Sequence, residues 1–114
     1  MCERKKEPYK GMLNLVGGKI ETDDYLSEAY RELFEETGIS RNDILLNHLM
    51  NFQYIKKDFE LQVFYGTLNK KVDLVEEVNK LIWISTSENF FDKDKFAGEG
   101  NIGHMLEEIN LEKW

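Results

Sequence analysis

Residues 17–39 read GGKIETDDYLSEAYRELFEETGI, and the rest of the chain is organised around this stretch. It opens with two glycines and a lysine, passes through an acidic turn, and continues as a predicted helix that ends at Gly38. Asp23 or Asp24 can cap the start of that helix. With about 3.6 residues per turn, four glutamates share one helix face and apolar side chains occupy the other. The acidic face consists of Glu28, Glu32, Glu35 and Glu36.

Such an acidic face is unfavourable for the helix itself. Like-charged pairs four residues apart cost roughly 0.2–0.5 kcal/mol each, and only Arg31 lies at the edge of the face. One interpretation is a solvated acidic surface. The other is a magnesium site, because Mg²⁺ takes oxygen ligands and bridges substrate phosphates. The glycine turn favours the second interpretation, since it can bring backbone carbonyls and Lys19 to the same place.

The same residues resemble the signature of the Nudix (MutT-like) hydrolase family. The segment from Arg31 to Ile39, RELFEETGI, matches the second half of the family box at every defined position. The first half departs from the box. Asp23 stands where the family has glutamate, and four residues instead of five separate it from Gly18. We therefore expect a turn one residue shorter than usual, with the helical glutamates still in register.

Length and composition are those of a single soluble domain over residues 1–114. The chain is 41% hydrophobic and 32% charged, and it has no apolar run of the roughly 20 residues that a membrane span needs. Its one cysteine, Cys2, excludes an internal disulfide and agrees with a cytoplasmic location.

The charge is unevenly distributed. The net charge of −7 argues against a nucleic-acid polymer as partner. Residues 1–19 nevertheless carry +3 and the remainder −10. Arg4 and its basic neighbours could therefore meet an anionic substrate, although a solubilising turn is the alternative for each of them.

Further elements follow from hydrophobic periodicity. We expect a short strand or an extended lead-in over 11–16, strands over 44–55, 59–65 and 81–84, and a last helix from about His104 to Lys113. The strand over 44–55 should bend near residues 48–51. The strands 44–55 and 59–65 should form an antiparallel hairpin. Residues 1–4 can be only the tail of a strand. The resemblance implies that one strand and most of a second are missing before it, so an uncovered sheet edge predicts a homodimer or poor solubility.

The resemblance also implies an α/β/α sandwich around a mixed central sheet, with Mg²⁺, or Mn²⁺ in its place, at the box. Glu32, Glu35 and Glu36 would hold the metal, with the Gly17 carbonyl as a further ligand. Lys19 would lie against the phosphates, and Arg31 would brace the turn through Glu21 or Asp23. The general base would be Glu77 or Glu36, with Glu76 next in line.

The substrate side is expected late in the chain. The resemblance implies that the segment before the last helix lies near the bound base or leaving group. Phe90 or Phe91 could stack on that base, and Glu99 or Asn101 could hydrogen-bond to its edge. The alternative for the two phenylalanines is one core contact and one surface contact.

The expected activity is Mg²⁺-dependent cleavage of a nucleoside diphosphate linked to another moiety, X. A nucleoside triphosphate, including one with an oxidised purine, hydrolysed to the monophosphate and pyrophosphate is the favoured substrate. Dinucleotides and sugar nucleotides stay open. The alternative is a nucleotide-binding or regulatory domain that keeps the fold and has lost turnover, as the short turn and Asp23 would suggest.

Overall fold

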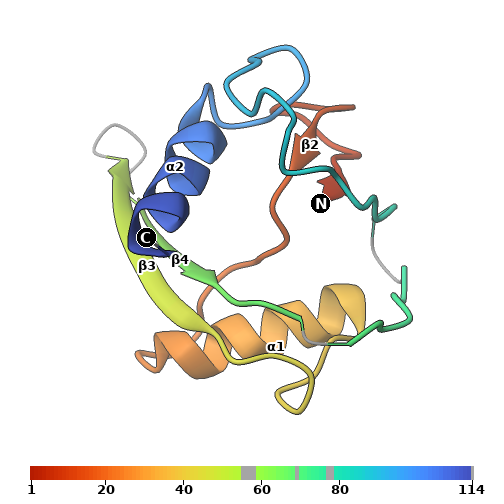
Figure 1. Cartoon of the computed structure of the whole chain (residues 1–114), viewed down its shortest axis with the longest axis vertical. Helices are drawn as coiled ribbons and strands as arrows, with labels where there is room; N and C mark the ends of the chain where they lie inside the picture. The colour runs from red at the N-terminus through yellow and green to blue at the C-terminus, as the bar shows by residue number, and fades with distance from the viewer. Residues whose placement is uncertain (55–58, 69, 77–78, 114) are drawn as a thin grey trace.

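The computed structural model describes residues 1–113 except 55–58, 69, 77 and 78, and side chains of the last helix as far as residue 109. Two helices and two small antiparallel sheets make up this part of an α/β fold (Figure 1). The elements in order are β1 (Cys2–Glu3), β2 (Leu13–Asn14), α1 (Tyr25–Thr37), β3 (Asn47–Tyr54), β4 (Phe59–Tyr65) and α2 (Asn101–Lys113).

Helix α1 begins and ends where the sequence predicts. Of the two candidate caps, Asp24 is the N-cap, and its carboxylate accepts a hydrogen bond of 3.1 Å from the Ser27 backbone N–H. Gly38 ends the helix in the left-handed conformation, with φ 80°, and its N–H donates to the Phe34 carbonyl at 2.9 Å. A left-handed residue with a Cβ is disfavoured, which explains why the helix stops at a glycine.

The predicted hairpin is confirmed as β3 and β4, paired antiparallel along their length. Its ladder shifts by one residue between His48 and Met50, which confirms the expected bend. One face carries apolar pairs that include Tyr54 and Phe59, whose rings stack at 4.7 Å. The opposite face carries Glu60 and Gln62.

The two helices lie on different sides of this hairpin. Helix α2 packs beside β3, where Phe52 meets the His104 ring edge-on and Tyr54 accepts a hydrogen bond from Asn101. Helix α1 lies beside β4 (Figure 1). One face of the hairpin therefore meets α2, and the opposite face meets the turn before α1.

A compact core joins the start of the chain to its late loop. It consists of Leu13, Phe90, Phe96 and Ile102, and Phe96 is almost completely buried. The Leu13 carbonyl accepts a hydrogen bond from the Ala97 N–H, and the Leu13 N–H donates to the Lys95 carbonyl, each at 2.9 Å. Leu13 and Phe96 thus form a parallel bridge that ties β2 to the segment before α2.

The structure contains little strand at two of the predicted places. Over 11–16, where a short strand or an extended lead-in is expected, β2 forms. Of the strand expected over 81–84, only Leu81 forms a bridge, with Cys2, although the Ile82 N–H also donates to the Met1 carbonyl at 2.8 Å. The partner, β1, is two residues long and offers too short an edge for a full strand. A single mixed sheet is not confirmed among the described residues.

Gly38→Ala should destabilise the fold by about 1–2 kcal/mol, because the new Cβ would occupy a left-handed backbone position and lie 2.9 Å from Val75 Cγ2. Urea denaturation followed by circular dichroism measures this. Gly17→Ala is the matched control, since a Cβ at Gly17 meets nothing within 4 Å and φ there is not left-handed. Equal losses in both variants would contradict the prediction.

Candidate active site

Arg31 is the common partner of three glutamates on the acidic face of α1. Its guanidinium donates to Glu28 at 2.5 and 2.8 Å and forms ion pairs with Glu32 and Glu35, both at 3.1 Å. A further hydrogen bond of 3.3 Å reaches the Lys19 carbonyl. These contacts, the Glu28 hydrogen bond above all, raise the pKa of Arg31 further above its ordinary value. One cation therefore holds three carboxylates and the turn together.

Glu28 links this cation to the turn. Glu28 is only 6% exposed, and the hydrogen bond from Arg31 lowers its pKa, with further hydrogen bonds from Thr22 and the Glu21 backbone acting in the same direction. Arg31 was expected to contact the turn, and it does so by a different route. Among the described contacts it runs through Glu28 and the Lys19 carbonyl, and not through the side chains of Glu21 or Asp23.

Glu36 contacts the glycine turn directly. Its Oε2 accepts a 2.9 Å hydrogen bond from the Gly17 N–H. Partial burial raises the pKa of Glu36, the Gly17 hydrogen bond opposes this, and the charges of Glu32 and Glu35 raise the pKa again. This carboxylate accordingly keeps its proton to a higher pH than an isolated glutamate does.

The second glycine passes close to Glu32. A Cβ at Gly18 would lie within 2.5 Å of Glu32 Oε1. The contact involves the far end of a flexible side chain, so a larger residue would push the Glu32 carboxylate aside without blocking the fold. The diglycine thus lets the turn backbone approach two carboxylates, Glu32 and Glu36.

The donor set suits a hard divalent cation in its chemistry. Glu32, Glu35 and Glu36 offer only oxygen ligands, which hard divalent cations prefer. In the part of the chain that the structure describes, however, no three acidic, histidine or cysteine side chains converge as a metal-binding group. Arg31 engages Glu32 and Glu35 there, so a metal would share these carboxylates with it.

The remaining predicted catalytic residues are less well defined. Lys19 has an exposed side chain and contributes its carbonyl to Arg31. Glu77 lies outside the described residues. Its neighbour Glu76 is exposed and accepts a 3.2 Å hydrogen bond from the Leu81 N–H.

Three further predicted substrate residues, Arg4, Glu99 and Asn101, have contacts away from the acidic face. Asn101 donates to the Tyr54 hydroxyl at 2.8 Å, and Arg4 donates to the Pro8 carbonyl at 2.7 Å. Desolvation raises the pKa of Tyr9, the charge of Glu99 raises it further, and the charge of Arg4 lowers it. No described contact joins these residues to the glutamates of α1.

The two phenylalanines separate into one core and one surface residue. Phe90 is 8% exposed and packs 4.9 Å from the Phe96 ring, so its faces are covered. Phe91 is 47% exposed and lies over Gly103, where a Cβ would come within 2.8 Å of the ring. Of the two, Phe91 alone presents an exposed ring.

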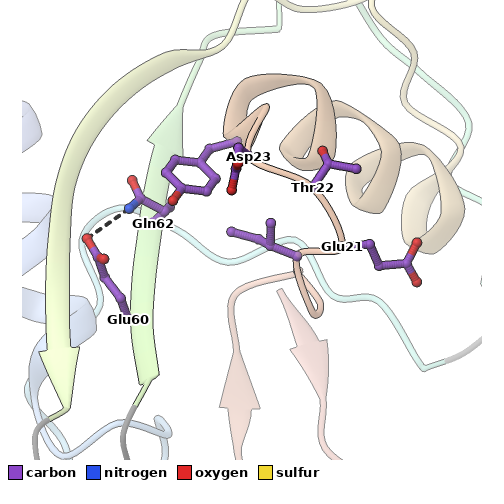
Figure 2. A pocket seen from close by; sticks show the side chains of 7 residues that line it. Glu21, Thr22, Asp23, Glu60 and Gln62 are labelled. Carbon is purple, nitrogen blue, oxygen red and sulfur yellow. Dashed lines mark hydrogen bonds between the residues drawn. The ribbon is translucent and has the colours of Figure 1, made fainter.

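A pocket of about 310 Å³ lies between the turn before α1 and strand β4 (Figure 2). It is lined by Ile20, Glu21, Thr22, Asp23, Tyr25, Glu60 and Gln62. Tyr25, Glu60 and Gln62 were not predicted as site residues from the sequence. The alternation along β4 does show that Glu60 and Gln62 share a polar face, but the turn opposite them is set by tertiary structure.

Comparison with protein families agrees with the box. A family model described as NUDIX domain matches residues 1–103. The chain belongs to the Nudix family. No match was found among curated proteins or solved structures. Membership implies a hydrolase of pyrophosphate bonds that acts on a small nucleotide derivative, and Nudix enzymes generally use divalent ions such as Mg²⁺. In the described part of this Nudix chain, no helix has the length and apolar character needed to cross a bilayer.

The raised pKa of Glu36 predicts a pH-dependent stability difference. Because the folded chain keeps this proton to higher pH than the unfolded chain, wild type should lose stability relative to Glu36→Gln as the pH rises from about 4.3 through the raised value. At neutral pH and without divalent cations, Glu36→Gln should have the higher Tm. Thermal denaturation in EDTA between pH 4 and 8 measures this. A Tm difference independent of pH would contradict it.

Proposed function

We propose that this protein is a Mg²⁺-dependent pyrophosphohydrolase of a nucleoside diphosphate linked to X. The observation that carries the proposal is the meeting of the diglycine turn with the box glutamates. Gly17 bonds to Glu36, Gly18 approaches Glu32, and Arg31 ties Glu28 and the Lys19 carbonyl into the same unit. A purely structural acidic helix gives no reason for a glycine turn held against its carboxylates.

Each residue of this unit then has a role. Glu32, Glu35 and Glu36, with the Gly17 carbonyl, would hold the metal. Bound Mg²⁺, or Mn²⁺, would supply charge neutralisation of the phosphates and a lower pKa for the attacking water. Lys19, exposed beside the turn, would bind phosphate oxygens. Glu36 would accept the proton of the water, with Glu77 as the other candidate base. Arg31 positions Glu32 and Glu35.

Among substrates, we favour a nucleoside triphosphate, including one with an oxidised purine, cleaved to the monophosphate and pyrophosphate. The support is the exposed ring of Phe91 and the side chain of Asn101, which the Tyr54 hydroxyl holds in place, with Arg4 and Glu99 as further candidate contacts. Phe90 is too buried to stack on a base unless the core opens.

The catalytically impaired alternative also has a specific observation in its favour. Arg31 already pairs with two of the three proposed metal ligands, Glu32 and Glu35. A domain that retains these pairs throughout would bind nucleotides through its other groups without turning them over.

Three wider features belong to the same proposal: the full α/β/α sandwich with a mixed sheet, a cytoplasmic location, and self-association. Exposed apolar side chains such as Trp83, 68% exposed, support a homodimer. Gel filtration that shows a monodisperse monomer at high concentration would count against the dimer.

Glu36→Gln should reduce Mg²⁺-dependent turnover by at least about a hundredfold while leaving the fold intact, because it removes both a metal ligand and a proton acceptor. Release of pyrophosphate and phosphate from a panel of nucleotides, with and without Mg²⁺, measures this. Glu107→Gln on α2 is the matched control, since it removes an exposed charge away from the turn. Retention of full activity in Glu36→Gln would refute the assigned role. Absence of turnover across the panel in wild type would favour the impaired domain.

A further inference from the structure

The pocket between the turn and β4 differs in chemistry from a phosphate site. The lining residues that the structure describes include three carboxylates, those of Glu21, Asp23 and Glu60, and no cationic side chain. Figure 2 shows the Glu21 carboxylate pointing away from Glu60 and Gln62, whereas Asp23 lies on the side toward them. Phosphate oxygens would be repelled here, and groups that donate hydrogen bonds would be favoured.

The polar wall of the pocket is oriented by its own hydrogen bonds. Gln62 donates its amide to Glu60 Oε1 at 2.9 Å, while its amide oxygen lies 3.2 Å from His48 Nε2. His48 in turn lies 2.6 Å from Asn51 Oδ1. An ionised carboxylate has about four acceptor positions, so Glu60 can accept further donors beside the one from Gln62. The network therefore holds an acceptor at a fixed place on β4.

The other wall offers a ring and an apolar side chain. Tyr25 is 40% exposed at the first position of α1, and Ile20 lines the pocket from the turn. A planar heterocycle can stack on such a ring. The pocket volume of about 310 Å³ lies at the lower end of the roughly 300–1,000 Å³ found for small-molecule sites, which suits a single base.

The pocket also lies within reach of the proposed phosphate site. Ile20 is three residues from Gly17, whose backbone contacts Glu36, and three extended residues span at most roughly 11 Å. A single nucleotide can therefore have its phosphates at the turn and its base in the pocket.

We propose that this pocket is the base subsite and that it selects bases with an exocyclic amino group, through stacking on Tyr25 and a hydrogen bond to Glu60. This inference rests on the proposed hydrolase function and adds a substrate class to it. It is an alternative to a base site at Phe91, Glu99 and Asn101, because Asn101 bonds to Tyr54 on the face of the hairpin that meets α2, whereas Glu60 lies on the opposite face.

Matched triphosphates that differ in an amino group test the subsite: GTP against ITP, ATP against ITP, and CTP against UTP. In wild type, the amino member of at least one pair should have a kcat/KM higher by about fivefold, as expected for a partly exposed charged contact. Glu60→Gln should bring that ratio close to one, because an amide both accepts and donates. Tyr25→Leu should weaken both members alike. Glu107→Gln, with the same loss of charge on α2, should leave the ratio unchanged.

Equilibrium dialysis of the same pairs with Mg²⁺ gives a readout that does not depend on turnover. The wild-type ratio of Kd values should favour the amino member, and Glu60→Gln should remove the preference while circular dichroism shows an intact fold. Equal binding of the members of every pair, no binding of either, or an unchanged ratio in Glu60→Gln would overturn the subsite. Absence of hydrolysis with the binding preference intact would overturn the hydrolase proposal alone.

Discussion

The charge of one guanidinium group sustains the organisation around α1. Four glutamates on a single helix face repel one another, and Arg31 relieves that repulsion by contacting Glu28, Glu32 and Glu35 together. Its planar fork can serve several acceptors at once, which the point charge of a lysine does less well. Through the Lys19 carbonyl, the same group fixes the turn to the helix. The close contacts of Gly18 with Glu32 and of Gly17 with Glu36 depend on that arrangement.

Within this unit the carboxylates have different surroundings. Glu28 is buried and fully engaged, and its lowered pKa marks it as an anion that serves the structure. Glu36, half-buried and facing two other negative charges, has a raised pKa and one backbone partner. Environment, and not residue type, therefore shifts the pKa values of two glutamates on the same helix face in opposite directions.

Local features were predictable from the sequence, and features that need a distant partner were less so. The ends of α1 depend on Asp24 and Gly38, whose capping works within a few residues, and both predictions are confirmed. The hairpin likewise follows from alternation in adjacent segments. The strand over 81–84 fails because strand formation requires an edge elsewhere, and β1 supplies only two residues. The pocket was missed for the same reason, since β4 and the turn meet only in the folded chain.

The extra residue in β3 has a consequence for how this chain can change in evolution. Opposite Phe64 and Val63, which are neighbours, stand His48 and Met50, with Leu49 left over. The extra residue reverses which side chains of β3 point to each face of the hairpin. His48 therefore shares the Gln62 face, while Phe52 and Tyr54 face α2. Length variation can be absorbed at that position. One residue gained or lost between Met50 and Tyr54 would instead turn the aromatic side chains away from α2, which makes this half of the hairpin intolerant of insertions and deletions.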